Sequence, residues 1–580
     1  MVEFLLINFV DDILPYKVHL INASVIAIDT ETTGLDPHTN KIRLIQLAAE
    51  GMPVFVIDCF TFLPEGLPIL REIISTKAVK VFQNAKFDLK FLLALEMPLP
   101  TTIFDTMLAA QLLRTSGGPQ RVGLEELVRH YLGENISKEN QKSDWRGTLT
   151  REQLEYAAKD AEVLLRLRKE IISKLRENNL IEVARQEFFC VHAIAQVEYN
   201  GINLNINRWN ELKEKIQKDQ QLLLEKLYEY AGHPTVQLSL FDEKIISGIN
   251  MDSNKQILSL LHEHGIDVEN TSRHALAPYS QNSLVQAITE YRRTSKLLST
   301  FLYSIPEQIH PVTARLHPKY SQIGSWSGRM SCGGPNIQQI PRDKDFRACF
   351  SAPEGKKLII ADYSQIELRV VAEISRDERM IKSYRNGEDL HRLTAALVSG
   401  KSLSQVTKEE RQAAKAMNFG LVFAMGAKGL QSYAKETYGV DMTLEQAEQF
   451  RNRFFNAYQG VAAWHKRLKN NPPMQSRTIA GRKHVYREGG GLSGLCNTPV
   501  QGSAADIIKN ALGMLANKIN YNSTKIVAVV HDEIVLETAG EQAEEMAAIL
   551  KETMERAGAE YFKLVPVVAE VEIADSWAEK

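Results

Sequence analysis

The sequence lacks most of the features that mark a disulfide scaffold, a membrane protein or a disordered chain. Its 580 residues contain only five cysteines, which are far apart and never form a C-x-x-C pair, so neither a disulfide framework nor a zinc site is indicated. No apolar run approaches the roughly 18 residues needed to cross a bilayer, and the apolar N-terminal segment lacks the flanks of a secretion signal. With 33 glycines and 20 prolines, the composition shows no collagen-like or disordered bias. We therefore expect a folded cytoplasmic protein that does not enter membranes.

An excess of charge of one sign is also missing. Lys and Arg number 69 and Asp and Glu number 71, so the net charge of −2 neither predicts nor excludes a nucleic-acid partner. The length predicts about four domains at about 150 residues each. Strand-like and helical patterns alternate up to about residue 175, long amphipathic patterns follow at 209–230 and 283–302, and β-branched strands return near the C-terminus. These patterns predict a multi-domain protein of the α/β and α+β classes.

Acidic residues follow a buried-strand pattern in the N-terminal part of the chain. The apolar run at 25–28 leads into Asp29 and Glu31, whose side chains share one face because strand side chains alternate with a period of two. Two further pairs are spaced four residues apart and would share a helical face: Asn84 with Asp88, and Tyr156 with Asp160. Carboxylates gathered in one place repel one another unless cations lie between them, and hard oxygen ligands suit Mg²⁺ or Mn²⁺. The pattern predicts a two-metal site, although any one motif alone also fits an Asp that caps a turn or a helix.

In this order, the motifs DTE, NAKFD and YAAKD resemble those of the DEDDy proofreading exonucleases, whose fold is related to ribonuclease H, over most of residues 1–180. The resemblance implies that two metal ions are held by four carboxylates: Asp29, Glu31, Asp88 and Asp160. It also implies that Tyr156 helps to position the attacking water. Leu35, six residues after Asp29, matches the apolar wedge that such domains place against a terminal base, and a core leucine is the equally supported alternative.

Two further aspartates lie at the ends of apolar runs in the C-terminal half. Asp362 directly follows the buried-strand pattern at 357–361, and Asp532 lies between two β-branched runs in a spacing that fits a tight turn. The two aspartates could therefore meet on one sheet. The alternative for Asp532 is a turn former, and the alternative for Glu367 is a helix cap, because Ser364 and Glu367 have the spacing of a capping box.

A cationic and aromatic stripe lies between these aspartates. In the motif RQAAKAMNFGLVF, side chains that recur every four residues would line one face of a helix: Arg411, Lys415, Phe419 and Phe423. A face that only needs burial has no reason to carry two cations, whereas a triphosphate needs cations and a base needs a flat apolar surface. The alternative is that the long Arg and Lys side chains snorkel over an apolar surface.

The motifs DYSQIELRV from Asp362, RQAAKAMNFG from Arg411 and VHDEI from Val530 resemble motifs A, B and C of the family A DNA polymerases. The resemblance covers about residues 180–580, and together with the exonuclease part it spans nearly the whole chain, as in the Klenow-like portion of bacterial DNA polymerase I enzymes. Further motifs add residues to the resemblance: SGRMS with Arg329, PNIQQIPR with Asn336 and Gln338, DLHRLTA with His391, and NTPVQG with Asn497 and Gln501.

The resemblance implies a ribonuclease H-like exonuclease domain followed by a right-hand polymerase with palm, fingers and thumb. The expected boundaries are residues 1–180 for the exonuclease domain, 181–310 for the thumb and connecting helices, 311–374 for the first part of the palm, 375–490 for the fingers and 491–580 for the second part of the palm. Because the exonuclease pattern starts near the N-terminus, we expect no separate 5′ nuclease domain.

The same resemblance implies roles for the residues of the polymerase site. Two Mg²⁺ ions, with Mn²⁺ as a substitute, would be held by Asp362, Tyr363 and Asp532. The incoming nucleotide would be contacted by Gln365, Glu367, His391, Arg411, Lys415, Phe419 and Phe423. Among these, Glu367 would crowd the sugar 2′ position and Lys415 would serve as a general acid. The DNA would be contacted by Arg329, Asn336, Gln338, Asn497, Gln501, His531 and, in the exonuclease domain, Leu35.

Two positions depart from the family pattern. Family members usually have Tyr-Gly where this chain has Phe423 and Ala424, so a hydroxyl that could bond to Glu367 is missing. The family often carries an Arg at the position of Ser493, so we expect one duplex contact to be absent. Sugar selectivity and mismatch sensitivity are the properties that these departures would change.

The predicted function is template-directed addition of dNTPs to a primer 3′-hydroxyl by two-metal phosphoryl transfer, with 3′–5′ proofreading, in DNA replication or repair. The expected partners are primer-template DNA and dNTPs. We expect a monomer in the cytoplasm at the nucleoid; a processivity factor and a phage or organellar source also fit the sequence. Two alternatives stay open: a nuclease that trims DNA or RNA ends, and a non-catalytic DNA-binding scaffold, which predicts the loss of at least one essential acid.

Overall fold

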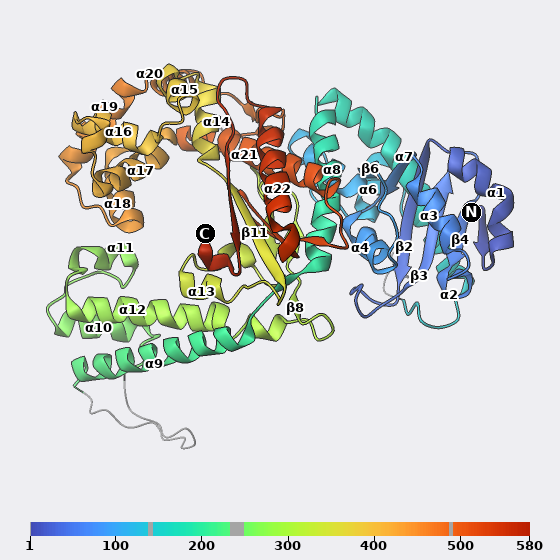
Figure 1. The fold of residues 1–580 in the computed structure, drawn as a ribbon, viewed down its shortest axis with the longest axis horizontal. Helices are drawn as coiled ribbons and strands as arrows, with labels where there is room; N and C mark the ends of the chain where they lie inside the picture. Colours follow the sequence, from blue (N-terminus) through green and yellow to red (C-terminus); the bar gives the residue numbers. More distant parts are fainter. Residues whose placement is uncertain (1, 137–142, 233–248, 487–490) are drawn as a thin grey trace. The chain divides into compact units, whose positions relative to one another are not determined.

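The computed structural model describes residues 2–136, 143–232, 249–486 and 491–580. The chain forms two units (Figure 1). The larger unit comprises Met1–Gly201, His317–Gln338 and Glu354–Ala574, and the smaller one comprises Ile202–Leu316, Gln339–Pro353 and Asp575–Lys580. All five cysteines are free and buried, as expected for a chain without a disulfide framework. None of the described helices combines the length and the apolarity that a bilayer span requires.

The N-terminal part of the larger unit is built on a six-stranded mixed sheet. Across the sheet its strands are β1 (Phe4–Ile7), β4 (Val54–Asp58), β3 (Ile42–Ala49), β2 (Val25–Thr32), β5 (Val79–Phe82) and β6 (Ile103–Asp105). Strands β2 and β3 are antiparallel, whereas β2 and β5 are parallel. The apolar run at 26–28 is completely buried in β2, so the acids that follow it are delivered at one end of a strand in the middle of the sheet.

Helices pack around this sheet: α1 (Val10–Asn22), α2 (Cys59–Phe62), α3 (Leu67–Ser75), α4 (Lys86–Ala94), α5 (Thr106–Leu113), α6 (Leu124–Leu132) and α7 (Arg151–Glu177) (Figure 1). The long helix α7 contacts β2, β3 and β4. The prediction that Asn84 and Asp88 share a helical face is wrong, because α4 begins only at Lys86 and Asn84 has a left-handed backbone with a φ of 63°. The spacing of Tyr156 and Asp160 is helical as predicted, since both lie on α7.

The C-terminal part of the larger unit is built on an antiparallel sheet, called the four-stranded sheet below. Across it the strands are β14 (Thr524–Val530), β15 (Glu533–Ala539), β11 (Lys356–Tyr363) and β16 (Ala569–Ala574). Strands β11 and β15 pair with Asp362 opposite Glu533, and β14 turns into β15 through His531 and Asp532. The predicted strands and the tight turn at Asp532 are confirmed.

Four helices pack against this sheet and one another: α8 (Ile181–Asn200), α14 (Ile366–Ser375), α21 (Leu492–Ala516) and α22 (Ala543–Ala559). Helix α8 contacts β14, α22 contacts β11 and β16, and α21 contacts α8, α14 and α22. Short two-stranded pairs complete the part of the unit that the structure describes: β9 (Lys319–Ser321) with β10 (Ser331–Gly333), and β12 (Gln475–Arg477) with β13 (Lys483–Val485). The apolar runs of β11, β14 and β15 are consequently buried.

A helical cluster follows α14: α15 (Glu378–Arg385), α16 (Leu390–Ser399), α17 (Lys408–Val422), α18 (Ala427–Tyr438), α19 (Leu444–Ala457) and α20 (Gln459–Asn470). Helix α17 carries the RQAAKAMNFG motif and packs on α16, α18 and α19. It begins with a capping box in which Thr407 and Glu410 satisfy each other's backbone N–H groups. The predicted helical face of this motif is therefore present.

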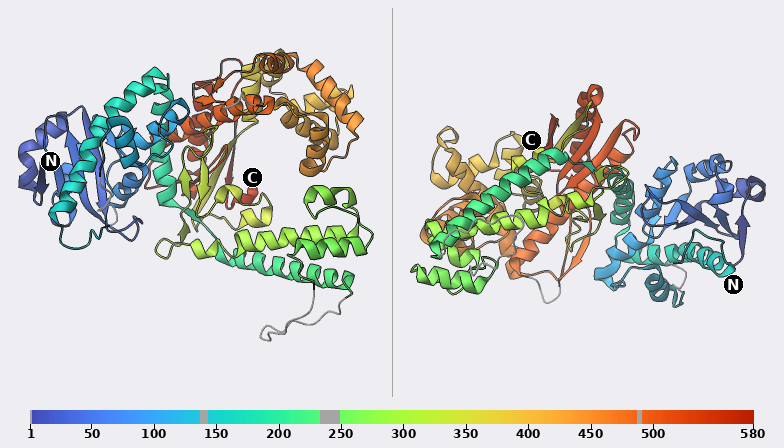
Figure 2. Two further views of the ribbon diagram at one scale, coloured as in Figure 1. Left: turned by 180° about the vertical axis from the view of Figure 1, so that it is seen from behind. Right: turned by 90° about the horizontal axis from the view of Figure 1, so that it is seen from below.

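The smaller unit contains the helices α9 (Ile206–Tyr230), α10 (Asn254–Glu263), α11 (Arg273–Leu276), α12 (Ser283–Leu297) and α13 (Lys344–Ala348) and the strands β7 (Ile202–Asn203) and β8 (Arg315–Leu316). Helices α9 and α12 lie side by side (Figure 2), as their amphipathic patterns predict. Trp209 is completely buried at the start of α9 and donates to the carbonyl oxygen of Leu302 at 3.2 Å. Helix α8 belongs to the larger unit, and the smaller unit begins at Ile202.

Four buried charged side chains connect distant elements of the larger unit. Lys509 of α21 lies 2.6 Å from Glu187 of α8, and Arg482 pairs both with Glu187 and, at 2.7 Å, with Asp506 of α21. None of the four is more than 5% exposed. Burial alone would raise the pKa of Glu187, but the two cations lower this pKa below its ordinary value. Lys509 also donates to the carbonyl oxygen of Gly328 at 2.7 Å, which fixes the loop between β9 and β10.

We predict that Glu187→Gln lowers the free energy of unfolding by about 3 kcal/mol, because it leaves an excess positive charge buried among these groups. The double variant Glu187→Gln/Lys509→Met removes one charge of each sign and should be less destabilised than Glu187→Gln alone. Glu182→Gln is the matched control on the same helix, because Glu182 is in an exposed pair with Arg185 and should change stability by no more than about 0.5 kcal/mol. Urea unfolding of the four proteins measures these differences, and a single variant as stable as the control would contradict the prediction.

Candidate active sites

Three of the four acids predicted in the N-terminal sheet region form one close cluster, and the fourth, Asp88, lies near it. Carboxylate oxygens of Asp29 and Glu31 on β2 and of Asp160 on α7 all lie within 4.8 Å of one another. Asp88 of α4 is 2% exposed and accepts a hydrogen bond from the hydroxyl of Thr30 at 2.6 Å. Its charge also raises the pKa values of Asp29 and Glu31, which means that it faces the same cluster. A strand and two helices thus supply four carboxylates to one place.

The electrostatics of this cluster favour a bound cation. Burial, followed by repulsion from the other three acids, raises the pKa of Asp29 well above its ordinary value. The same causes raise the pKa of Glu31 to about 9, and burial raises the pKa values of Asp88 and Asp160 to about 7. The Oδ1 atom of Asp160 is buried and has no hydrogen-bond partner among the described residues. Hard oxygen donors that repel one another fit a divalent cation such as Mg²⁺ or Mn²⁺.

Two other predicted residues flank the acid cluster. Tyr156 lies one turn before Asp160 on α7 and hydrogen-bonds to its carboxylate. Burial and the nearby acids hold the pKa of Tyr156 far above its ordinary value, so the phenol remains a neutral O–H donor. Leu35, in the loop after β2, is 82% exposed. The alternative that Leu35 is a core leucine is therefore wrong.

Asp105 is a buried acid in this region that motif reasoning missed. It is 1% exposed and accepts hydrogen bonds at 2.8 Å from the backbone N–H groups of Ala85 and Met107. It therefore joins the turn before α4 to the start of α5, and so positions the helix that carries Asp88. Its signal in the sequence is an Asp directly before an apolar helical run, which is the pattern of an N-cap.

Asp362 and Asp532 meet at one end of the four-stranded sheet. Asp362 is the penultimate residue of β11, opposite Glu533, and the backbone N–H of Tyr363 donates to the carbonyl oxygen of Asp532 at 3.4 Å. Tyr363 itself is 2% exposed and its hydroxyl donates to the carbonyl oxygen of Met554 on α22 at 2.8 Å. The side chain of Tyr363 is therefore directed away from the aspartates, and only its backbone carbonyl is available as a metal ligand.

Glu367 is not a helix cap. Helix α14 begins at Ile366 after Gln365, which has a left-handed backbone with a φ of 55° and makes no side-chain capping bond. Glu367 instead forms an ion pair with Arg329, and Gln365 accepts a hydrogen bond from Tyr384 at 3.2 Å. Burial raises the pKa of Glu367, Arg329 lowers it and Asp532 raises it further. The influence of Asp532 means that Glu367 lies near the aspartate pair.

The predicted face of α17 carries its cations and aromatic rings in register. Arg411 Nε lies 2.6 Å from a carboxylate oxygen of Asp389 at the start of α16. Phe419 packs against the ring of His391 with centroids 5.8 Å apart. His391 is 2% exposed, so only a small edge of its ring reaches the surface. Phe423 lies just beyond the end of the helix and caps it.

Five of the predicted DNA-contacting residues lie on three segments of the larger unit. Asn336 and Gln338 are in the segment after β10, where Gln338 donates to the carbonyl oxygen of Val529 at 3.5 Å and is thereby brought to the strand that leads to Asp532. His531 is exposed at the turn itself and has a φ of 58°. The remaining pair, Asn497 and Gln501, lies four residues apart on α21.

Comparisons with known proteins agree with this geometry. Residues 206–579 match the model of "DNA polymerase family A", and residues 15–176 match that of "3'-5' exonuclease". The chain is 34% identical to DNA polymerase I of Aquifex aeolicus, with 96% of each chain covered. It is 31% identical to DNA polymerase I of Pseudomonas aeruginosa, where the match covers 96% of this chain and 64% of the relative.

This chain belongs to DNA polymerase family A.

The fold agrees with that membership. The POL domain of Pol1 from M. smegmatis superposes with a TM-score of 0.80 over 98% of both chains, at 23% sequence identity. The ribonuclease H-like and right-hand architecture expected from the motifs is thus confirmed, and so is a 3′–5′ exonuclease domain. Both classes of enzyme generally use divalent metal ions. Every acid of the two predicted sets is present, so the scaffold alternative, which predicts the loss of one, is not supported.

One departure of this polymerase from its family has a visible structural consequence. Ala424, which follows Phe423, has a φ of 63°. Glycine adopts this left-handed conformation freely, whereas a Cβ atom makes it unfavourable by about 1 kcal/mol. This chain adopts the left-handed conformation with an alanine, where the expected family pattern has a glycine. The other departure, Ser493, is exposed in the first turn of α21, four residues before Asn497.

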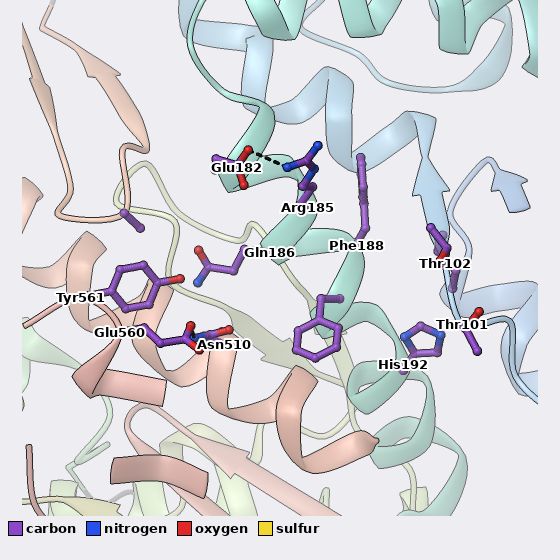
Figure 3. A pocket seen from close by; sticks show the side chains of 13 residues that line it. Thr101, Thr102, Glu182, Arg185, Gln186, Phe188, His192, Asn510, Glu560 and Tyr561 are labelled. Atoms are coloured by element: carbon purple, nitrogen blue, oxygen red, sulfur yellow. Dashed lines mark hydrogen bonds and ion pairs between the residues drawn. The ribbon is translucent and has the colours of Figure 1, made fainter. Parts of the chain in front are cut away.

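A cavity of about 590 Å³ lies elsewhere in the larger unit, along α8 (Figure 3). Figure 3 shows Gln186 of α8 pointing toward Tyr561 and Asn510, with His192 and Thr101 on the other side. None of the predicted site residues lines this cavity.

We predict that divalent ions stabilise the exonuclease acid cluster more at high pH than at low pH. Without metal, the raised pKa values mean that the folded acids keep protons which the unfolded acids release, so stability falls as pH rises from about 4 through 7 toward about 9. Mg²⁺ or Mn²⁺ replaces those protons and removes the repulsion. Thermal unfolding with chelator and with metal, at about pH 6 and about pH 8.5, measures the difference.

The double variant Asp29→Asn/Asp160→Asn is the control for this prediction, because it removes two ligands while keeping their size. Its melting temperature should depend less on pH without metal, and the additional metal stabilisation at high pH should be lost. A metal effect of equal size at both pH values in the unmodified protein would contradict the prediction.

Proposed function

We propose that this family A polymerase adds dNTPs to the 3′-hydroxyl of a DNA primer under the direction of a template, and that its N-terminal domain removes mismatched primer ends. The observation that carries the first activity is the meeting of Asp362 and Asp532 at one end of the four-stranded sheet. The solved relative from M. smegmatis is described as a complex with DNA primer-template and dNTP, and this supports the same substrates here. The larger unit supplies both sets of acids.

We assign two divalent ions, Mg²⁺ or as a substitute Mn²⁺, to Asp362, Asp532 and the carbonyl oxygen of Tyr363. When bound, such ions activate the primer hydroxyl and neutralise charge on the leaving pyrophosphate. Phosphoryl transfer otherwise needs little beyond positioning and charge neutralisation. Arg411 and Lys415, four residues apart on α17, are suited to hold the triphosphate oxygens, and Lys415 also donates a proton to the leaving group.

The remaining residues of α17 and α14 orient the nucleotide. Phe419 offers a flat apolar face to the base, and Phe423 and Gln365 border the same site. Glu367 crowds the 2′ position of the sugar and thereby excludes ribonucleotides. Its ion pair with Arg329 holds the carboxylate in a fixed place, which is the requirement for a steric barrier.

The DNA is held by polar side chains that read shape rather than sequence. The six residues assigned to the primer terminus and minor groove are Arg329, Asn336, Gln338, Asn497, Gln501 and His531. Minor-groove acceptors are nearly the same for all base pairs, so such contacts test geometry without selecting a sequence. The link from Gln338 to the strand before Asp532 supports a role at the primer end.

In the exonuclease domain, we assign Asp29, Glu31, Asp88 and Asp160 to two divalent ions and Tyr156 to the attacking water. The neutral hydroxyl of Tyr156 can donate or accept a hydrogen bond at that water. The exposed Leu35 serves as the wedge that separates the terminal base from its neighbour, because its side chain is 82% exposed and can pack against a base.

The cellular context is also part of the proposal. We assign the exonuclease, thumb, palm and fingers to the residue ranges expected from the sequence, with the thumb beginning at Ile202. The protein acts as a monomer in the cytoplasm at the nucleoid, in replication or repair, with a processivity factor as an optional partner. Primer extension by the purified chain alone, without and with cell extract, tests the dependence on such a factor.

We predict that the two activities separate by mutation. Asp532→Ala should lower primer extension by on the order of a thousandfold, because it removes a ligand that stabilises transition-state charge by several kcal/mol. It should leave degradation of single-stranded DNA unchanged. Asp29→Ala should have the reverse effect, with loss of mismatched-end removal and normal extension. Gel assays with a labelled primer measure both activities.

The control for this pair is Glu50→Ala, since Glu50 is an exposed acid that pairs with Lys169 on the surface. It should change neither activity. The assignment of the two acid sets fails if Asp29→Ala still digests single strands at the normal rate, or if Asp532→Ala still extends primers.

We predict that Glu367→Ala increases ribonucleotide incorporation by on the order of tenfold to a hundredfold, because the sugar pocket loses a bulky side chain. Glu367→Gln keeps the size and should retain discrimination. Glu373→Ala is the matched control on the same helix, because Glu373 accepts hydrogen bonds from the backbone of Leu564 and is assigned no role at the sugar. The ratio of kcat/KM for dNTP and rNTP measures the effect, and an unchanged ratio in Glu367→Ala would reject the steric role.

A further inference from the structure

A chain of buried hydrogen bonds ends on His391. Asn418 Nδ2 lies 2.8 Å from His391 Nδ1, and the hydroxyl of Thr394 donates to Asn418 Oδ1 at 2.9 Å. The hydroxyl of Tyr458 lies 2.7 Å from that of Thr394. These side chains come from α16, α17 and the junction of α19 and α20, and none is more than 2% exposed. Polar groups buried this deeply fix one another's orientation because each needs its partner.

The ring of His391 carries a single proton at neutral pH. Burial lowers its pKa to about 4; Arg411 and Lys415 lower this pKa too, whereas Asp389 opposes the shift. A neutral imidazole has one nitrogen that donates and one that accepts. The position of the proton is therefore decided by what the two nitrogens contact.

The contact at Nδ1, at the end of the chain of hydrogen bonds, determines which nitrogen carries the proton. The amide of Asn418 lies with its NH₂ toward His391 and with its oxygen toward the hydroxyl of Thr394, which also lies 2.8 Å from the carbonyl oxygen of Leu390. An NH₂ group can only donate, so Nδ1 must be the bare acceptor and the proton must be on Nε2. No hydrogen bond to Nε2 is found among the residues that the structure describes, which leaves this N–H for another acceptor.

We propose that Asn418 is a positioning residue that, together with Thr394 and Tyr458, keeps the proton of His391 on Nε2, so that this nitrogen donates to a phosphate oxygen of the incoming nucleotide. This inference rests on the proposed polymerase function. The opposite tautomer would present a lone pair to an anionic triphosphate and repel it. A neutral donor also adds no third positive charge beside Arg411 and Lys415, where an imidazolium would be repelled.

The tautomer can be measured without any assay of activity. The intact protein is labelled with ¹⁵N-histidine, and the His391 signals are identified by their loss in His391→Gln. Long-range ¹H–¹⁵N correlation should show Nδ1 without a proton and Nε2 with one. A proton on Nδ1 would overturn the inference. This result does not depend on whether the protein extends primers, so it is separate from the test of the proposed function.

Variants that break this chain of hydrogen bonds test its effect on nucleotide binding. Asn418→Leu and Thr394→Val remove the hydrogen bonds and should raise the apparent KM for dNTP by on the order of tenfold, with a smaller change in kcat. Thr394→Ser keeps the hydroxyl and should restore the normal KM. Single-strand degradation by the exonuclease domain of the same molecules should be unchanged. An unaltered KM in Asn418→Leu would overturn the inference.

Asn510→Leu is the matched control, since Asn510 is a buried asparagine on α21 that donates to the carbonyl oxygen of Ala557 at 3.3 Å. It loses comparable hydrogen bonds far from His391 and should leave the KM for dNTP normal. If it raised that KM as much as Asn418→Leu does, the effect would be one of general packing and the inference would fail.

Asn418→Asp gives a pH signature that a structural role would not produce. A carboxylate can only accept hydrogen bonds, so the neutral ring would carry its proton on Nδ1 and leave Nε2 without a proton. The ring then donates from Nε2 only when it is doubly protonated. The new acid raises the pKa of His391, and the KM for dNTP should increase as pH rises through that pKa. The other charged groups that face the ring, Asp389, Arg411 and Lys415, are unchanged in this variant. A KM independent of pH would contradict the proposed tautomer control.

Discussion

Both sites depend on one constraint: carboxylates of like charge lie close together where apolar strands end. In the N-terminal sheet, burial and, after it, repulsion between the acids raise the pKa values of Asp29 and Glu31. In the four-stranded sheet, the antiparallel register brings Asp362 opposite Glu533 and beside Asp532. Burial of the strands holds the acids in place, because a slip of one residue would turn every side chain to the other face. Divalent cations would relieve such repulsion, and family A polymerases and 3′–5′ exonucleases generally use divalent metal ions.

The buried group of Glu187, Asp506, Arg482 and Lys509 shows the opposite arrangement. Its two positive and two negative charges balance, so the protein itself satisfies them and no external ion is needed. The group connects α8, α21 and the β12–β13 hairpin, and through the carbonyl oxygen of Gly328 it fixes the loop that contains the SGRMS motif. Positive and negative charges are thus equal in number in this buried group, which holds the framework rigid. The proposed sites for ions and phosphates instead carry an excess of charge of one sign.

The groups assigned to the nucleotide are held by neighbours before they meet any substrate. Arg411 is held by Asp389, and Glu367 is held by Arg329. His391 is held by Asn418, which decides the position of its proton rather than its charge. Such partners limit the rotamers of long side chains, so less conformational entropy is lost when a triphosphate binds. Positioning, more than chemical participation, is what most of these buried contacts contribute.

The sequence by itself determined the elements and the chemical groups, because strand and helix periodicity and motif spacing are local properties. It placed Asp362 and Asp532 at strand ends and the cations of motif B on one helical face, and it identified the family. Only the tertiary structure decided which groups meet: it paired Glu367 with Arg329 in place of a capping role, and it left Leu35 exposed instead of buried. It also brought together Glu187 and its partners on α21, more than three hundred positions away. The physical reason is that burial and ion pairing depend on how distant elements pack, and no local pattern records that.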